Sequence, residues 1–153
     1  MKKTTFWAFL LSLVTLISCN SNEVHLRLAH YNVGVFHKTA ESSIDVIAAM
    51  MKEIEADVVS LNELDSCARR TGFVDQLARM SALMGDWGSH YVSAMPFQGG
   101  AYGVGITYDP SLNLVKKDKV ALPKLLGPEP RVLAVTEFED FVFATCHLDY
   151  VSE

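Results

Sequence analysis

The sequence lacks the short motifs that most often reveal a protein's chemistry. Its 153 residues contain no CxxC, GxGxxG, P-loop, GxSxG or HExxH pattern, which excludes the usual signatures of zinc ribbons, dinucleotide-binding turns, P-loop NTPases, α/β-hydrolases and zinc peptidases. Positive charge is also scarce, since the net charge is −5, and this argues against tight, non-specific binding to nucleic acid. What remains, with 50% hydrophobic residues and no repeat or low-complexity run, is typical of one globular domain.

The first 24 residues have the pattern of an export signal. Lys2 and Lys3 precede an apolar run at 6–17, which is shorter than the roughly 20 residues of a membrane-spanning helix. The run leads into Leu-Ile-Ser-Cys at 16–19, which resembles the lipobox of bacterial lipoproteins. We therefore expect a signal peptide over 1–18, a lipidated Cys19, a tether over 19–24, and a protein exported to the cell envelope and anchored to a bacterial membrane. The alternative is an ordinary signal with a chance cysteine, and a secreted protein.

Two further cysteines, Cys67 and Cys146, could pair outside the cytoplasm or stay free. Because Cys146 lies in an apolar segment with the pattern of a strand, a buried free thiol is favoured. Adjacent strand residues point to opposite faces, so Cys146 and His147 are not expected to act as a nucleophile pair.

Apolar periodicity predicts a mixed chain in which helices come first and short strands follow. A strand begins near residue 24, a helix follows at 44–54 and a strand at 57–63, which together form a strand–helix–strand unit. A second helix is expected at 73–84, where Gly85 is a helix stop. The remaining strands are predicted at 90–95, 102–108, 112–122, 131–137 and 141–148.

Polar side chains follow three of these strands, where α/β folds place ligands. They are Asn32, Glu63, and His147 with Asp149. A carboxylate held after a buried strand suits Mg²⁺, which binds one or two carboxylates, waters and phosphate oxygens. The Asn32 amide could orient that carboxylate or donate to phosphate. His147 could donate to a phosphoryl oxygen or, when protonated, stabilise its developing charge.

Each of these residues also has a simpler interpretation. Glu63 could be a carboxylate without a ligand, Asn32 could cap a turn before Gly34, and His147 could be a hydrogen-bonded residue at a strand end. Asp65 and Asp149 could be solvated loop residues. Spacing alone leaves these alternatives open.

The order of five segments is more specific than any one of them. HYNVG, ADVVSLNELD, YGVGITYDP, EPRVLAVTEF and FATCHLDYVSE together resemble the endonuclease/exonuclease/phosphatase family of DNase I-like nucleases, neutral sphingomyelinases and inositol-phosphate phosphatases. The resemblance implies an α+β fold over residues 25–153: the N-terminal half of a four-layer α/β/β/α sandwich with mixed, mostly antiparallel sheets.

The resemblance also implies a role for each site residue. Glu63 matches the family's Mg²⁺ ligand, with Mn²⁺ as an alternative cation, and Asn32 and His147 match catalytic residues that position phosphate. Arg131 and Asp149 are expected to contact the substrate. Two positions depart from the family pattern: Asn62 replaces the usual glutamine before the glutamate, and ITYDP replaces LSR.P, which removes an arginine.

The family hydrolyses phosphoesters with water activated by a base from its C-terminal half, and the GD.N and Asp-His segments that supply it are not in this sequence. We therefore expect a fragment of a metal-dependent phosphoesterase with little or no activity. Its substrate would be nucleic acid, a sphingolipid or an inositol or sugar phosphate, and no obligate protein partner is evident. The alternative is a non-catalytic surface lipoprotein that binds a phosphorylated ligand. Half of a sandwich would expose one sheet face, so we also expect poor solubility or self-association.

Overall fold

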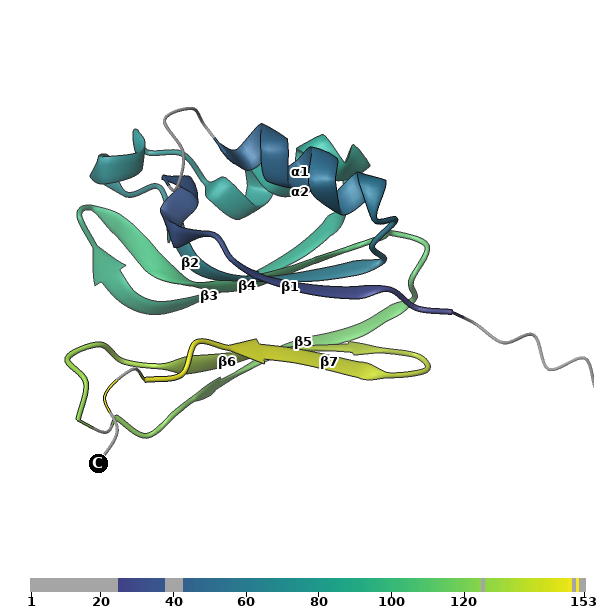
Figure 1. The fold of residues 1–153 in the computed structure, drawn as a ribbon. Helices are drawn as coiled ribbons and strands as arrows, with labels where there is room; N and C mark the ends of the chain where they lie inside the picture. Colours follow the sequence, from purple (N-terminus) through teal and green to yellow (C-terminus); the bar gives the residue numbers. More distant parts are fainter. Residues whose placement is uncertain (1–24, 38–42, 125, 150, 152–153) are drawn as a thin grey trace, which may run out of the picture.

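The computed structural model describes residues 25–37, 43–124, 126–149 and 151, which form three layers (Figure 1). The predicted signal peptide, the tether and Cys19 lie outside the described residues. Among the residues described, no helix is long and apolar enough to cross a membrane. The elements in chain order are β1 (Leu28–Asn32), η1 (Gly34–Phe36), α1 (Ser43–Glu53), β2 (Val58–Ser66), η2 (Arg69–Thr71), α2 (Gln76–Gly85), β3 (Gly88–Phe97), β4 (Gly100–Tyr108), β5 (Leu114–Ala121), β6 (Val132–Phe138) and β7 (Val142–Cys146).

The first sheet has the strand order β1-β2-β4-β3, and both α-helices cover one of its faces (Figure 1). β1 and β2 run parallel because α1 connects them, whereas β2, β4 and β3 pair antiparallel. The apolar stripe of α1, including Ile44, Ile47 and Met51, packs on Val59 and Leu61 of β2. α2 starts later than predicted, because the Asp75 side chain caps it by accepting a hydrogen bond from the backbone N–H of Ala78.

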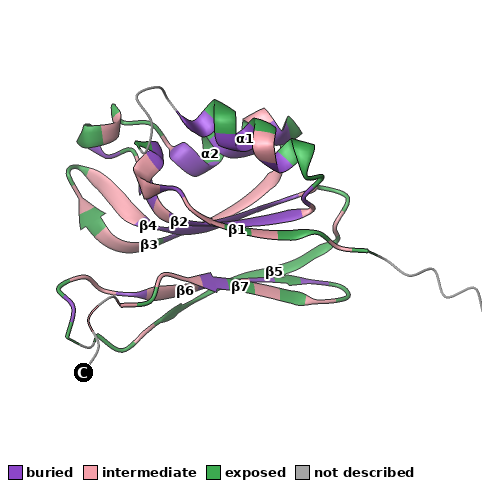
Figure 2. Cartoon of the chain, viewed as in Figure 1, coloured by how far each residue is buried: buried purple, intermediate pink, exposed green. Residues whose placement is uncertain are grey.

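The second sheet has the antiparallel order β5-β6-β7 and packs on the face of the first sheet that the helices leave open. Ala134 and Phe138 of β6 meet Val58 and Ile106 of the first sheet in this second core. Among the residues described, no helix covers the outer face of the second sheet, where Val120 and Val142 are 49% and 62% exposed. Figure 2 shows the contrast between buried β2 and exposed β5.

The predicted α+β class, with mixed and mostly antiparallel sheets, is confirmed, and three layers of the expected sandwich are present. Two further details differ from the expectations. The strand predicted to end at Glu63 continues to Ser66, and Asp65, for which a solvated loop position was considered, is completely buried. Both described cysteines are free, with Cys67 exposed and Cys146 only half-buried.

Candidate functional site

Glu63 lies in a β-bulge of β2. The register between β2 and β4 shifts between Asn62 and Leu64, so Glu63 is the extra residue and has no partner in the ladder. Its φ of 60° is in the left-handed region that non-glycine residues seldom adopt. A bulge of this kind turns a side chain away from the regular alternation of the strand. Glu63 is therefore half-exposed, while Asn62 and Leu64 on either side are buried.

Asn32 holds the Glu63 carboxylate from the end of the neighbouring strand. Because β1 and β2 are parallel and in register, Asn32 lies beside Asn62, one residue from the bulge. The Asn32 amide nitrogen donates to Glu63 Oε1 at 2.7 Å, and the Asn32 carbonyl oxygen accepts from the Gly34 backbone N–H at 3.0 Å. Asn32 thus caps the turn and orients the carboxylate, which combines the two interpretations that spacing left open.

Asn62 joins the two sheets next to this site. Its amide nitrogen donates to the backbone carbonyl of Cys146 at 3.2 Å, and its carbonyl oxygen accepts from Thr145 Oγ1 at 3.4 Å. Asn62 and Thr145 are both buried, so these polar contacts cross the apolar space between the sheets. They set the position of the end of β7, and His147 is the next residue.

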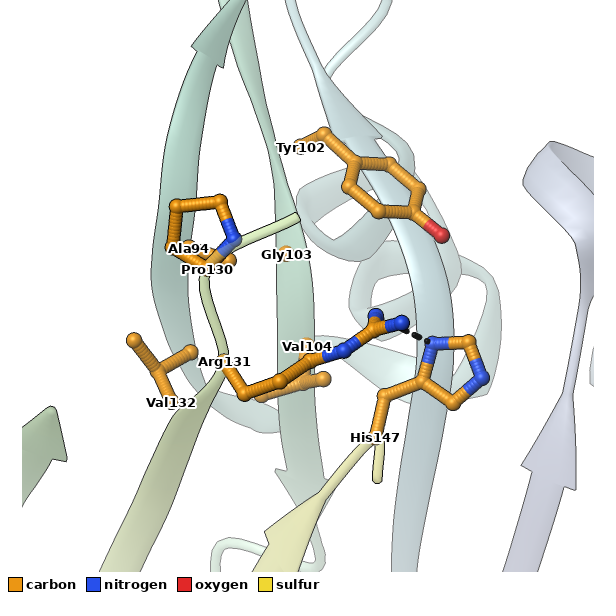
Figure 3. A pocket seen from close by; sticks show the side chains of 8 residues that line it. All are labelled: Ala94, Tyr102, Gly103, Val104, Pro130, Arg131, Val132 and His147. Atoms are coloured by element: carbon orange, nitrogen blue, oxygen red, sulfur yellow. Dashed lines mark hydrogen bonds between the residues drawn. The ribbon is translucent and has the colours of Figure 1, made fainter. Parts of the chain in front are cut away.

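His147 lies between Glu63 and Arg131. Its Nε2 is 3.8 Å from Glu63 Oε1. Its Nδ1 is 3.3 Å from Arg131 Nη1, the contact that the dashed line in Figure 3 marks. Because a guanidinium only donates, Nδ1 must accept in this contact. The neutral ring therefore carries its proton on Nε2, and the N–H group points to the side of the Glu63 carboxylate.

Arg131 precedes β6, and its side chain is only 7% exposed. Besides His147, it contacts Glu129 Oε2 at 3.1 Å and Asp149 Oδ1 at 3.9 Å. Asp149 also accepts from the Gly127 backbone N–H at 2.8 Å. Among the described residues, nothing accepts a hydrogen bond from the buried Arg131 Nε. Arg131 and Asp149 therefore tie the loop before β6 to the end of β7.

The structure thus brings four of the predicted residues, Asn32, Glu63, Arg131 and His147, into one connected group. Asp149 is linked to this group by its ion pair with Arg131. Its contact with substrate stays a prediction.

Comparison with solved structures identifies this arrangement of sheets and helices. The chain matches an endonuclease/exonuclease/phosphatase family protein from Bacteroides thetaiotaomicron with a TM-score of 0.63 and 17% identity, over 83% of this chain and 50% of that one. It matches the mannosyl-6-phosphatase of Bacteroides thetaiotaomicron VPI-5482 with a TM-score of 0.64 and 18% identity, over 84% and 54%. Truncated Caenorhabditis elegans TDP2 matches with a TM-score of 0.58 and 16% identity, over 81% and 46%. The fold is that of the endonuclease/exonuclease/phosphatase family.

The chain spans about half the length of these endonuclease/exonuclease/phosphatase structures. No family model matches the sequence, and no curated protein matches it. The solved structures nevertheless confirm the predicted resemblance at the level of the fold.

The residues present suit a hard divalent cation that takes few protein ligands. Among the described residues, no group of three His, Cys, Asp or Glu side chains could enclose a metal ion. Glu63 nevertheless offers a carboxylate that is 32% exposed and whose Oε2 accepts no hydrogen bond within the described part of the chain. Mg²⁺ is commonly held by one or two carboxylates together with waters and phosphate oxygens. A single carboxylate of this kind suits Mg²⁺ or Mn²⁺ better than Zn²⁺, which is usually held by three or four protein ligands.

Two residues near the site were not identified from the sequence. Tyr102 at the start of β4 lines cavities together with His147 and with Glu63, and burial raises the pKa of its hydroxyl to about 12. Alternation along β4 would have placed it on the same face as Val104, which faces the second sheet. Arg70 lines the cavity beside Glu63. The Asp65 carboxylate and the more distant Phe97 ring hold it in place, and the contact with Phe97 has no local sequence pattern that would predict it.

Proposed function

We propose that this chain carries the cation-binding and phosphate-binding part of a metal-dependent phosphoesterase. The observation that supports this proposal is the convergence of a carboxylate, an imidazole N–H and a guanidinium from two different sheets. The Glu63 carboxylate, a ligand for the metal, stands 3.8 Å from His147 Nε2, a donor for phosphate. Groups held in this way by a rigid frame suit the recognition of a phosphoryl group and its counter-cation.

In this proposal Glu63 supplies the protein carboxylate to Mg²⁺ or Mn²⁺, and Asn32 fixes the direction of that carboxylate. When bound, the cation supplies positive charge next to the phosphoryl oxygens. The Nε2–H group of His147 donates a hydrogen bond to a phosphoryl oxygen, because the other ring nitrogen, Nδ1, already accepts one from Arg131. Arg131 adds a positive charge behind the imidazole and keeps the ring from turning.

We further propose that these residues alone turn over little or no substrate. Hydrolysis requires a base for the attacking water. Glu63 is assigned to the cation, the Nε2 of His147 already holds a proton, and Glu129 is paired with Arg131. The lack of a base among these residues also favours the second candidate, a non-catalytic lipoprotein that binds a phosphorylated ligand. A measurement of substrate turnover would distinguish the two candidates.

Substrate candidates are nucleic acid, a sphingolipid and an inositol or sugar phosphate. The mannosyl-6-phosphatase likeness makes a sugar phosphate reasonable, while the net charge of −5 makes nucleic acid less suitable. For the N-terminal region, whose structure is not described, we propose export and lipidation at Cys19. Incorporation of a radiolabelled fatty acid that is lost in Cys19→Ala would support it, and incorporation that persists in the variant would contradict it.

Calorimetric titration with MnCl₂, with and without inorganic phosphate, tests the binding proposal. We expect phosphate to bind only with the cation, and Glu63→Ala to weaken cation binding at least about tenfold, the effect of losing about 1.4 kcal/mol. Glu137→Ala is the matched control, because Glu137 is exposed on the second sheet. Equal affinities in Glu63→Ala and the unaltered chain would reject the site. Mg²⁺-dependent hydrolysis of p-nitrophenyl phosphate that Glu63→Ala abolishes would reject the low-turnover part.

A further inference from the structure

A second compartment opens directly beside Glu63. It is a cavity of about 140 Å³, and its lining includes Glu63 of the candidate site together with Arg70, Phe97, Tyr102 and Glu129. We call it the Arg70 cavity. Its walls are mainly polar. None of Arg70, Phe97 or Glu129 has a role in the binding of cation or phosphate proposed above.

Arg70 is fixed in place before any ligand arrives. Its Nε and Nη2 donate to the two carboxylate oxygens of Asp65 at 2.7 and 2.8 Å, and Asp65 is completely buried. Thr71 Oγ1 donates to the same carboxylate at 3.2 Å. The guanidinium also lies over the Phe97 ring, 4.3 Å from its centroid. An arginine locked on two sides loses little conformational entropy when it binds a ligand.

The remaining donors of Arg70 are available to a ligand. Within the described part of the chain, no group accepts a hydrogen bond from Nη1, and the side chain remains 34% exposed. Glu129 lines the same cavity; its Oε2 accepts from Arg131, and no described residue donates to its Oε1. A fixed donor and a carboxylate acceptor in one small cavity match the two needs of a hydroxyl group, which accepts one hydrogen bond and donates another.

The same features argue against other ligands. A quaternary ammonium headgroup binds on open aromatic faces, but the guanidinium of Arg70 already covers Phe97. An acyl chain needs apolar walls, whereas the surface that the Arg70 cavity exposes is mainly polar although Val35 and Met95 also line it. A nucleic-acid strand needs a row of cations along its backbone, whereas Glu63, Asp65 and Glu129 balance or exceed the local positive charge. The cavity is also small compared with ordinary ligand pockets of roughly 300–1,000 Å³.

We infer that the Arg70 cavity receives the alcohol part of the phosphoester and that this alcohol is a small, hydroxyl-rich ring such as a hexose or an inositol. Arg70 and Glu129 bind its hydroxyl groups, and Phe97 supports Arg70. This inference rests on the proposed function, because Glu63 and its cation must hold the phosphate at the mouth of the cavity.

The test compares two phosphates that differ only in their alcohol. Titrations of the full chain with MnCl₂ present would measure the affinities for mannose 6-phosphate and for ethyl phosphate, with phosphocholine as a third probe. We expect mannose 6-phosphate to bind about ten times more tightly than ethyl phosphate, as a charged hydrogen bond or two would give. Arg70→Lys, which keeps the charge beside Asp65, and Phe97→Leu should each reduce this ratio to about one. Arg69→Lys, an exposed neighbour on the same 3₁₀ turn, should leave the ratio unchanged.

Equal binding of mannose 6-phosphate and ethyl phosphate, with both still dependent on Glu63, would overturn the inference and leave the proposed function standing. Tighter binding of phosphocholine than of mannose 6-phosphate would do the same. Binding of neither phosphate, or binding that Glu63→Ala does not change, would overturn both. Arg70→Lys and Phe97→Leu are to be checked for folding by thermal unfolding, and a ratio that stays near ten in a folded variant would also contradict the inference.

Discussion

The two sheets of this molecule differ in how they are covered. The first sheet has a core on each face, one against the helices and one against the second sheet, and β2 within it is almost wholly buried. The second sheet has a core on one face only, and every residue of β5 is exposed. The candidate site draws Asn32 and Glu63 from the first sheet and His147 from the end of the second. One half of the site is therefore firmly held, and the other depends on a few contacts between the sheets.

The largest expected difference between the sheets is in core truncation. Leu61 of β2 is completely buried, whereas Val142 of β7 is 62% exposed. Leu61→Ala should lower the free energy of unfolding by about 2–5 kcal/mol, because it leaves a cavity between α1 and the sheet. Val142→Ala should change it by less than about 0.5 kcal/mol. Urea unfolding measures both, and similar losses for the two variants would contradict the contrast between the sheets.

The next effect concerns two ion pairs that differ in how far they are buried. Asp65→Asn weakens the pair of a buried carboxylate with Arg70 and should cost about 2 kcal/mol, less than for a fully buried pair because Arg70 reaches water. Asp45→Asn removes a pair with Arg79 in which both side chains are more than half exposed, and it should cost less than about 0.5 kcal/mol. Thermal unfolding of the two variants is the measurement. A greater loss for Asp45→Asn would show that burial does not set the strength of these pairs.

A smaller effect is expected at the link between the sheets. Asn62→Ala removes the donor to the Cys146 carbonyl and should cost about 1 kcal/mol of stability. Because the end of β7 is then less constrained, affinity for phosphate in the presence of Mn²⁺ should fall as well. Ser66→Ala is a control in the same strand, because the Ser66 side chain donates to Asp75 and makes no hydrogen bond to β7 among the described residues. If Asn62→Ala loses stability but keeps full phosphate affinity, the link does not position His147.

The last prediction has its effect only in alkali and concerns the response of the inter-sheet face to high pH. The pKa of Tyr102 is about 12, against an ordinary value of 10.0, mainly because burial disfavours the phenolate. The folded pKa is above the unfolded one, so this contribution to stability is complete below pH 10 and is lost as pH rises through 12. Tyr102→Phe should therefore lose less stability than the unaltered chain between pH 10 and 12. Unfolding curves across this range give the answer, and identical pH dependence would contradict the assignment.

Periodicity and turn residues were enough to predict most strands and both helices, because these depend on local patterns. The meeting of Asn32, Glu63 and His147 could also be predicted, since strand ends converge in this type of fold. The bulge at Glu63 could not, because it is defined by the register with β4. The burial of Asp65 was missed for a similar reason: its partner Arg70 is held over Phe97, 27 residues later in the chain. Non-local contacts decide these features, and a single sequence does not display them.

The bulge at Glu63 sets stability against function at a single residue. A glycine would adopt φ of 60° at no steric cost, and deletion of the residue would restore the regular ladder between β2 and β4. Either change would favour the fold and remove the carboxylate. Screens that select only for thermal tolerance or expression would therefore tend to enrich variants that have lost the site, and a more robust protein from such a screen would need its cation binding measured again. At position 63, selection for stability and selection for cation binding would therefore favour different residues.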